Sequence, residues 1–241
     1  MGRYINVGNN LSYTGPKKIF HTVSSVASSG GSTWTVPEGV TCATFEIWGG
    51  GGSGSPSCCC TCWGGDAGYG GAYSLKTLSV TPGSKYTLAV GQGGCGNQCW
   101  FNGNACGCCG GTTFVTGTGL TNFCAEGGKG GVWCNVWGYG QASAVACGGD
   151  INLQGGQSHK ANYCCWSGCG GISAGGESPF GGGLTWSPGG VGAEGVFYNC
   201  GYTGTFPGGG SPNRQMYRSG WCDCCSGCTA GGADGLIVIT I

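Results

Sequence analysis

Cysteine is the residue type with the greatest chemical potential in this sequence, which holds 21 cysteines and two histidines among 241 residues. Most cysteines are clustered, and a C-x-x-C spacing recurs within the clusters. Such pairs bind zinc as thiolates, or form disulfides that staple loops too rich in glycine to bury a core. In a third interpretation, cysteines spaced three residues apart form one ridge of a polyproline II helix, because this helix has three residues per turn. The clustered residues are Cys58, Cys59, Cys60 and Cys62; Cys106, Cys108 and Cys109; Cys164, Cys165 and Cys169; and Cys222, Cys224, Cys225 and Cys228.

Disulfides are the interpretation that we favour for these clustered cysteines. Zinc modules commonly separate two thiolate pairs by a helix or ribbon, and only His21 and His159 could add imidazole ligands. We therefore expect neither a bound metal nor another cofactor. Because the number of cysteines is odd, at least one thiol stays unpaired within a chain or pairs between chains. The sequence leaves the connectivity open.

Aromatic residues next to the cysteines offer a second chemistry. Trp63, Trp100, Trp133, Trp166 and Trp221 each adjoin a cysteine. They either cover disulfides and fill the interiors of loops, or lie exposed as flat platforms on which a sugar ring stacks. The residues that we predict as receptor contacts are Trp63, Trp100, Tyr163, Trp166, Tyr198, Tyr202 and Trp221.

Catalysis has little support in the sequence. Glu126, Glu177 and Glu194 could act as glycosidase carboxylates, but nothing around them singles out a pair. No Ser/His/Asp arrangement follows from two histidines, and the glycines at 91–96 lack the lysine and the helix of a phosphate-binding loop. We predict that the protein is not an enzyme.

Composition excludes several classes of partner. Only 7% of residues are charged and the formal net charge is zero, so the clustered lysines and arginines that bind nucleic acid are lacking. No run of 18 apolar residues predicts a membrane span, and the N-terminus does not resemble a signal peptide. The 59 glycines lack a strict Gly-X-Y period, which excludes a collagen triple helix.

Two kinds of element must position the cysteines and aromatic residues. Period-two alternation over 35–48 places Ala43, Phe45 and Ile47 on one face of a strand that runs directly into four glycines. The apolar run 236–241 suits a strand buried on both faces and returned beside this first strand. Thr81-Pro82-Gly83 predicts a hairpin-like turn between two further strands. The remaining predicted strands are 18–26, 72–80, 84–90, 112–116 and 142–147.

Glycine pairs recur between Cys147 and Gly235, in tracts with almost no side chains for strands to pack on. Polyproline II helices leave their N–H and C=O groups free to pair with neighbouring helices. Because glycine permits close approach, several such helices can lie backbone to backbone in a lattice. We therefore predict an all-β protein with polyglycine II helices and almost no α-helix.

Several motifs, taken together and in this order, resemble the glycine-rich domain of bacteriophage tail proteins over about residues 33–241. They are Thr35-Val36-Pro37-Glu38-Gly39, Phe45-Glu46-Ile47-Trp48-Gly49-Gly50-Gly51-Gly52, Val80-Thr81-Pro82-Gly83, Tyr86-Thr87-Leu88-Ala89-Val90-Gly91-Gln92-Gly93-Gly94 and Gly232-Ala233-Asp234-Gly235-Leu236-Ile237-Val238-Ile239. A more distant likeness links the glycine tracts to polyglycine II adhesins of T-even-type phages. The cysteine content departs from both.

The resemblance implies a virion structural protein, such as a tail-fibre or fibre-tip adhesin that binds a host-surface glycan or outer-membrane protein. Residues 1–32 would form an arm and linker that attach it to other virion proteins. Residues 33–241 would form the glycine-rich domain, with strands mainly at 33–147 and 235–241 and glycine tracts mainly at 148–234. The expected location is the virion, and a homotrimer, common among fibres, is one candidate assembly. The alternatives are a purely architectural virion component and a thiolate metal-binding protein.

Overall fold

Twelve β-strands and no helix make up the regular structure of the residues that a computed structural model of the chain describes. The structure describes residues 16–22, 31–55, 66–96, 107–131, 142–161, 172–181, 203–211 and 230–241. The strands are β1 Lys18–His21, β2 Ser32–Thr35, β3 Cys42–Trp48, β4 Tyr73–Ser79, β5 Lys85–Ala89, β6 Thr113–Thr116, β7 Cys124–Ala125, β8 Ala146–Cys147, β9 Ile151–Leu153, β10 His159–Ala161, β11 Ile172–Ala174 and β12 Leu236–Thr240.

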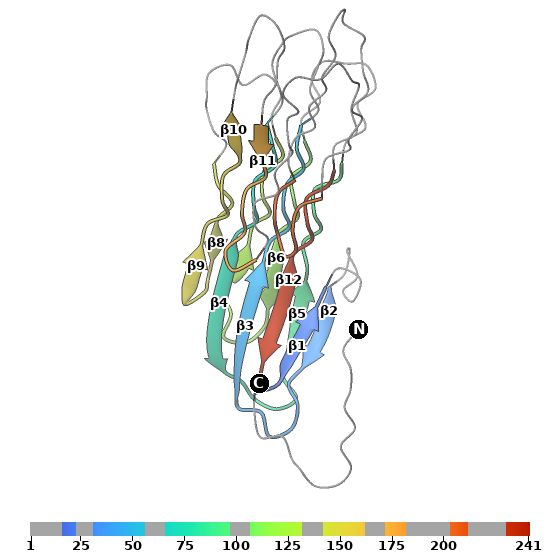
Figure 1. The fold of residues 1–241 in the computed structure, drawn as a ribbon. Helices are drawn as coiled ribbons and strands as arrows, with labels where there is room; N and C mark the ends of the chain where they lie inside the picture. The colour runs from blue at the N-terminus through green and yellow to red at the C-terminus, as the bar shows by residue number, and fades with distance from the viewer. Residues whose placement is uncertain are drawn as a thin grey trace, which may run out of the picture.

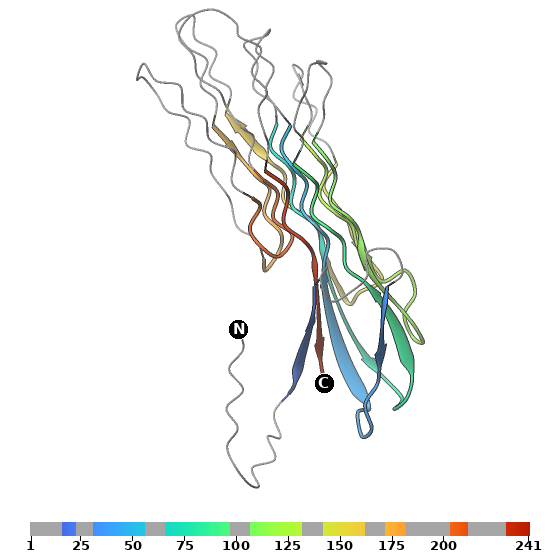
Figure 2. The same cartoon turned by 90° about the vertical axis from the view of Figure 1, so that its right-hand side faces the viewer.

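Ten of these strands form two antiparallel sheets of five strands each. The first sheet has the order β1-β12-β3-β4-β9, the second has the order β2-β5-β6-β7-β8, and β10 and β11 form a separate pair. The two sheets pack face to face at the end of the molecule that holds the C-terminus (Figures 1 and 2). The predicted return of the C-terminal strand is confirmed, since β12 pairs with β3 from Leu236↔Trp48 to Thr240↔Thr44.

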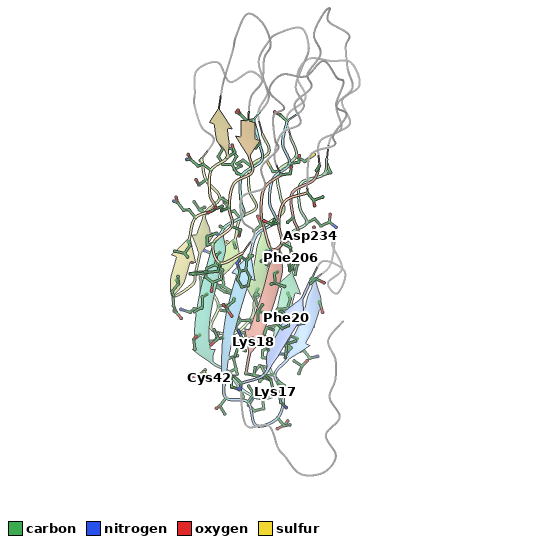
Figure 3. The ribbon with its side chains drawn as sticks, in the orientation of Figure 1. Lys17, Lys18, Phe20, Cys42, Phe206 and Asp234 are labelled. Atoms are coloured by element: carbon green, nitrogen blue, oxygen red, sulfur yellow. The ribbon has the colours of Figure 1, made fainter. Side chains whose placement is uncertain are left out.

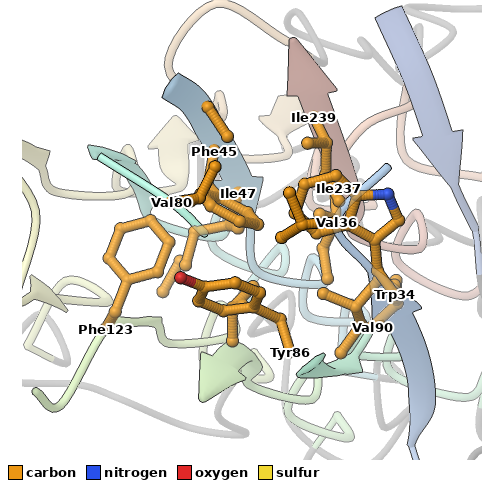
Figure 4. Close-up of a cluster of buried hydrophobic side chains, with 14 of the residues drawn as sticks. Trp34, Val36, Phe45, Ile47, Val80, Tyr86, Val90, Phe123, Ile237 and Ile239 are labelled. Atoms are coloured by element: carbon orange, nitrogen blue, oxygen red, sulfur yellow. The ribbon is translucent and has the colours of Figure 1, made fainter. Parts of the chain in front are cut away.

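Alternating apolar residues fill the space between the sheets. Phe45 and Ile47 of β3 are fully buried, as the period-two pattern predicted, and Ile237 and Ile239 of β12 lie beside them. An aromatic cluster closes the centre: the ring of Phe45 lies 5.6 Å from that of Trp34 and 5.3 Å from that of Tyr86 (Figure 4). Edge-to-face and tilted contacts of this kind are favourable beyond their area.

Each long strand continues beyond the sandwich as a glycine tract, and the tracts bundle into what we call the glycine lattice (Figure 2). Residues 49–55 form its central tract. Their N–H groups donate to the tracts 66–72, 107–111 and 230–233, and their carbonyls accept from 91–94, 126–131 and 208–211. One tract is therefore surrounded by three neighbours that accept and three that donate. The other tracts of the lattice are 154–156, 175–178 and 203–207.

The hydrogen bonds of the central tract repeat every third residue, which is the period of a polyproline II helix. Gly49 donates to Ala72, Gly52 to Tyr69 and Ser55 to Asp66, at 3.0, 2.9 and 2.8 Å. A β-carbon on any of Gly49, Gly50, Gly51 or Gly52 would overlap a carbonyl group of a neighbouring tract. The polyglycine II prediction is thus confirmed, and it follows from main chain packed on main chain.

Two predicted details of the sandwich are wrong. The strands on either side of the Thr81-Pro82-Gly83 turn do not pair as a hairpin: β4 pairs with β3 and β9, whereas β5 pairs with β2 and β6. The turn carries the chain from one sheet to the other, because both strands have an apolar face that must meet the shared core. The arm and linker predicted at residues 1–32 also end earlier than expected, since Ser32 already belongs to β2.

The positions of the glycine tracts and strands along the chain also differ from the expectation. Glycine tracts begin at Gly49 and alternate with strands, whereas the sequence led us to place them mainly at 148–234. Part of the predicted attachment arm belongs to the sandwich. Strand β1 pairs with β12 from Lys18↔Thr240 to His21↔Ile237, and Ile19 packs against the core.

Candidate functional site

The far end of the glycine lattice, opposite the sandwich, is where four undescribed stretches leave and re-enter the described chain. Ser55 donates its N–H to Asp66 at 2.8 Å on either side of 56–65. Ala161 of β10 pairs with Ile172 of β11 on either side of 162–171, and both strands lie at this end in Figure 1. The Ser211 hydroxyl donates to the Ala230 carbonyl at 2.6 Å on either side of 212–229. Gly96 and Gly107 border the fourth stretch, 97–106.

Most of the predicted site residues fall in these stretches, outside the described residues. They include the aromatic residues Trp63, Trp100, Tyr163, Trp166 and Trp221, and twelve of the fourteen clustered cysteines, all except Cys108 and Cys109. Tyr198 and Tyr202 lie in another undescribed stretch, 182–202. The structure therefore shows where these stretches begin and end, and it does not describe the predicted site residues within them.

A second candidate site lies where the sandwich meets the lattice. It is a shallow, open groove lined by Gln154, Gly156, Glu177, Ser178, Pro179, Phe180 and Gly181. The Phe180 side chain is 77% exposed, the highest value among the large apolar residues that the structure describes. An exposed aromatic ring beside polar side chains is the arrangement that stacks on one face of a sugar and hydrogen-bonds its hydroxyls.

Aromatic contacts, and a hydrogen bond to the neighbouring Pro179, hold Phe180 in place. Its ring lies 5.1 Å from that of Tyr73, edge to face, and Tyr73 lies 4.8 Å from Trp48. The indole Nε1 of Trp48 donates to the carbonyl of Pro179 at 2.7 Å. Phe180 itself adopts a left-handed backbone conformation, with φ of 54°, which is uncommon for a bulky residue. The exposed ring is thus fixed on the outer face of the first sheet.

Polar groups under the groove have an unusual electrostatic environment. The Tyr73 hydroxyl donates to Oε1 of Glu46 at 3.0 Å. Burial, and then the charge of Glu46 and this hydrogen bond, raise the pKa of Tyr73 well above its ordinary value. The hydroxyl of Ser178 is buried and has no hydrogen-bond partner among the described residues. A buried hydroxyl without a partner is costly.

A neighbouring loop adds another exposed aromatic side chain. Phe206 is 53% exposed, and its loop contacts Asp234 just before β12, since the N–H of Gly208 donates to the Asp234 carbonyl at 2.9 Å (Figure 3). The loops are in contact, because a β-carbon on Gly181 would lie 2.6 Å from the carbonyl oxygen of Pro207. Asp234 ties this region to the lattice by accepting the Gly93 N–H at 2.8 Å.

The described cysteines are in the thiol form: Cys42, Cys95, Cys108, Cys109, Cys124 and Cys147. Cys108 and Cys109 are the two disulfide candidates among them. Burial, and then the neighbouring Cys95 thiol, raise the pKa of Cys108 to about 11. Within the described ranges, no group of three or more His, Cys, Asp or Glu side chains is arranged to hold a metal ion.

Phe180 was not among the predicted receptor contacts, because those were selected mainly among aromatic residues close to cysteines. The signal was present in Ser178-Pro179-Phe180-Gly181, where proline and glycine flank an aromatic residue in a turn that cannot bury it. Alternation puts Trp48 on the face opposite Phe45, but its contact with Pro179 joins residues 131 positions apart. No local pattern indicates such a contact.

Comparison with known families gives a match over most of the chain. A family model described as a glycine-rich domain matches residues 26–236. The chain belongs to this glycine-rich domain family. The match includes strands β2 to β11 and the glycine tracts, and it ends at Leu236, the first residue of β12. A search of curated proteins finds no match. None of the described elements is a helix with the length and apolarity needed to span a bilayer.

Proposed function

We propose that this glycine-rich protein is a bacteriophage virion protein, an adhesin at a tail fibre or fibre tip that binds a host-surface glycan or outer-membrane protein. The observation that carries the proposal is the glycine lattice. Its tracts are cross-linked by backbone hydrogen bonds on all sides, and four segments start and finish at its far end. A stalk held together by backbone hydrogen bonds, with several segments of the chain bordered at one end, is suited to binding a surface.

The composition of the presented segments supports the same role. Five of the seven predicted receptor contacts lie in them, namely Trp63, Trp100, Tyr163, Trp166 and Trp221. Tryptophan and tyrosine supply large, rigid contact areas at low cost in conformational entropy, and they are enriched at binding hot spots. The groove beside Phe180 would add a stacking contact on the flank of the stalk, with Gln154 and Glu177 as hydrogen-bonding groups.

Attachment to the particle falls to the opposite end in this proposal. Residues 1–32 carry the expected contact with other virion proteins. Because β1 belongs to the sandwich, the part available for docking is residues 1–15. The protein would act in the virion, by binding and without catalysis.

Competition for adsorption tests the proposed function. Fluorescently labelled full-length protein is added to the bacterial host of the particle that carries it, and bound protein and phage adsorption are both measured. We expect saturable binding and slower adsorption of the phage. Trp166→Ala and Phe180→Ala should each weaken binding about tenfold or more, as hot-spot aromatic residues do. The control is Phe114→Ala on the second sheet, a residue that is 39% exposed and does not line the groove beside Phe180.

The architectural alternative gives a different result in this experiment. If the protein only stiffens or decorates the fibre, labelled protein does not bind host cells and phage adsorption is unchanged by an excess of it. That outcome would contradict the adhesin. Particles that lack the protein would then be misassembled or less stable, while intact ones adsorb normally.

A further inference from the structure

Two cysteines outside the clustered motifs lie opposite each other on neighbouring strands of the second sheet. Cys124 of β7 is the Cα partner of Cys147 of β8, and Ala125 pairs with Ala146 beside them. Ala125 is fully buried in the core, so by alternation the two cysteines share the outer face of the sheet. Cys147 is exposed and Cys124 is half-buried.

The hydrogen-bond ladder fixes the spacing of this pair. Glu126 donates its N–H to the carbonyl of Val145 at 2.9 Å, which makes Glu126 and Val145 a hydrogen-bonded pair. Because such pairs alternate along an antiparallel ladder, Cys124 and Cys147 also occupy a hydrogen-bonded position, with Cα atoms about 5.5 Å apart. That separation lies within the range of disulfides, whose Cα atoms are most often about 5.5–6 Å apart. Burial, and then the neighbouring Cys147 thiol, raise the pKa of Cys124, as expected for two thiols side by side.

We infer that Cys124 and Cys147 form an intramolecular disulfide when the protein meets an oxidising environment. This inference is independent of the proposed function. The bond would lock β8, the edge strand of the second sheet, at the point where the chain crosses to β9 at the edge of the first sheet. Gly148, which follows Cys147, has a φ of +76° and starts this crossing.

Thiol–disulfide exchange with glutathione disulfide is the simplest route to this bond. The Cys147 thiolate is accessible, so it attacks one sulfur of glutathione disulfide; the glutathione S–S bond breaks and one glutathione thiolate leaves with the electron pair. The Cys124 thiolate then attacks the Cys147 sulfur of the mixed disulfide, and the second glutathione thiolate leaves. The two leaving thiolates take up the protons lost by the two cysteines. In sum, two cysteine thiols are oxidised and one glutathione disulfide is reduced to two glutathione molecules.

Peptide mapping tests the inference on the full-length protein. The native protein is incubated with glutathione disulfide, unfolded in iodoacetamide without a reductant, digested and analysed by mass spectrometry. We expect one linked peptide pair that contains Cys124 and Cys147 and is lighter than the sum of the two free peptides by two hydrogen atoms. Alkylated Cys124 and Cys147, or links from either residue to other cysteines, would overturn the inference.

Stability provides a second readout. After oxidation, Cys124→Ser and Cys147→Ser should each lower Tm by roughly 5–10 °C, because the bond closes a loop with 22 residues between its ends. After reduction, both variants should melt close to the reduced wild type. The matched control is Cys42→Ser, because Cys42 is exposed at the other end of the sandwich and faces Ser79 across β4 (Figure 3). Equal melting of all oxidised proteins would contradict the bond.

Discussion

A buried threonine joins the sandwich to the lattice at the scale of single residues. The Thr113 hydroxyl donates to the carbonyl of Trp48 at 2.6 Å and accepts the N–H of Gly91 at 2.9 Å. The side chain is fully buried, so neither partner can turn to water instead. The two partners are the last residue of β3 and the first glycine after Val90, where side-chain packing gives way to backbone packing.

Replacing this hydroxyl should be costly although the shape is kept. We expect Thr113→Val to lower the free energy of unfolding by about 2–4 kcal/mol, because a buried N–H and a buried carbonyl both lose their partner. Thr113→Ser keeps the hydroxyl and should cost about 1 kcal/mol for the lost methyl group. Urea unfolding curves of the two variants measure the difference. Equal losses would show that the hydroxyl carries no special role.

Tyr73 makes the free energy of unfolding depend on pH in the alkaline range. Burial chiefly, and then Glu46, raise the pKa of Tyr73 in the folded protein above its ordinary value of 10.0. The neutral phenol is therefore favoured by folding, and its contribution is fully present below about pH 10 and is lost as the pH rises further. In unfolding experiments between pH 8 and 11, stability should fall less steeply with pH in Tyr73→Phe than in the wild type. Parallel curves would contradict this assignment.

Strand β1 is the element whose role changed most between sequence and structure. It covers the edge of β12, and Lys17 and Ile241 exchange backbone hydrogen bonds of 2.8 and 3.0 Å. A truncation of residues 1–15 should leave Tm unchanged. A truncation of residues 1–22 should lower the free energy of unfolding by about 2–4 kcal/mol and promote aggregation, since it removes a ladder and Ile19 and exposes a strand edge. Calorimetry and light scattering separate the two, and similar melting of both would contradict the structural role of β1.

Elements with their own side-chain pattern were predictable, and their partners were less so. Alternation over Ala43, Phe45 and Ile47 fixed the inward face of β3, and the apolar run at the C-terminus was correctly placed beside it. The pairing of β4 and β5 failed, because a Pro-Gly turn looks the same whether it joins neighbours in one sheet or crosses between two. The short strands β7 to β11 have two or three residues each, and of these only β8 falls within a predicted strand, 142–147.

The candidate site shows the same division. A lattice of polyglycine II helices followed from the scarcity of side chains, but which tract lies against which depends on contacts between residues far apart. Gly51, for example, donates to Ala233 and accepts from Gly94. The pair Cys124 and Cys147 was invisible for the same reason, because neither residue has the C-x-x-C spacing of the clusters and only the register of β7 and β8 brings them together.

At the scale of the whole molecule, the account depends on main chain packed against main chain. The sandwich is an ordinary hydrophobic structure, with buried aromatic and aliphatic side chains. The lattice has no such core, and its cohesion comes from hydrogen bonds between tracts and from close contact that only glycine allows. The two parts therefore respond differently to the same substitution.

Thermal unfolding of two glycine-to-alanine variants tests this claim most directly. In Gly51→Ala the new methyl group would overlap the carbonyl of Gly209, whereas in Gly83→Ala it would meet nothing within 4 Å and only a φ of +80° opposes it. We predict that Gly51→Ala fails to fold or loses more than about 10 °C in Tm, and that Gly83→Ala loses about 2–6 °C. A Gly51→Ala protein that melts at or above the temperature of Gly83→Ala would contradict a lattice of bare backbone.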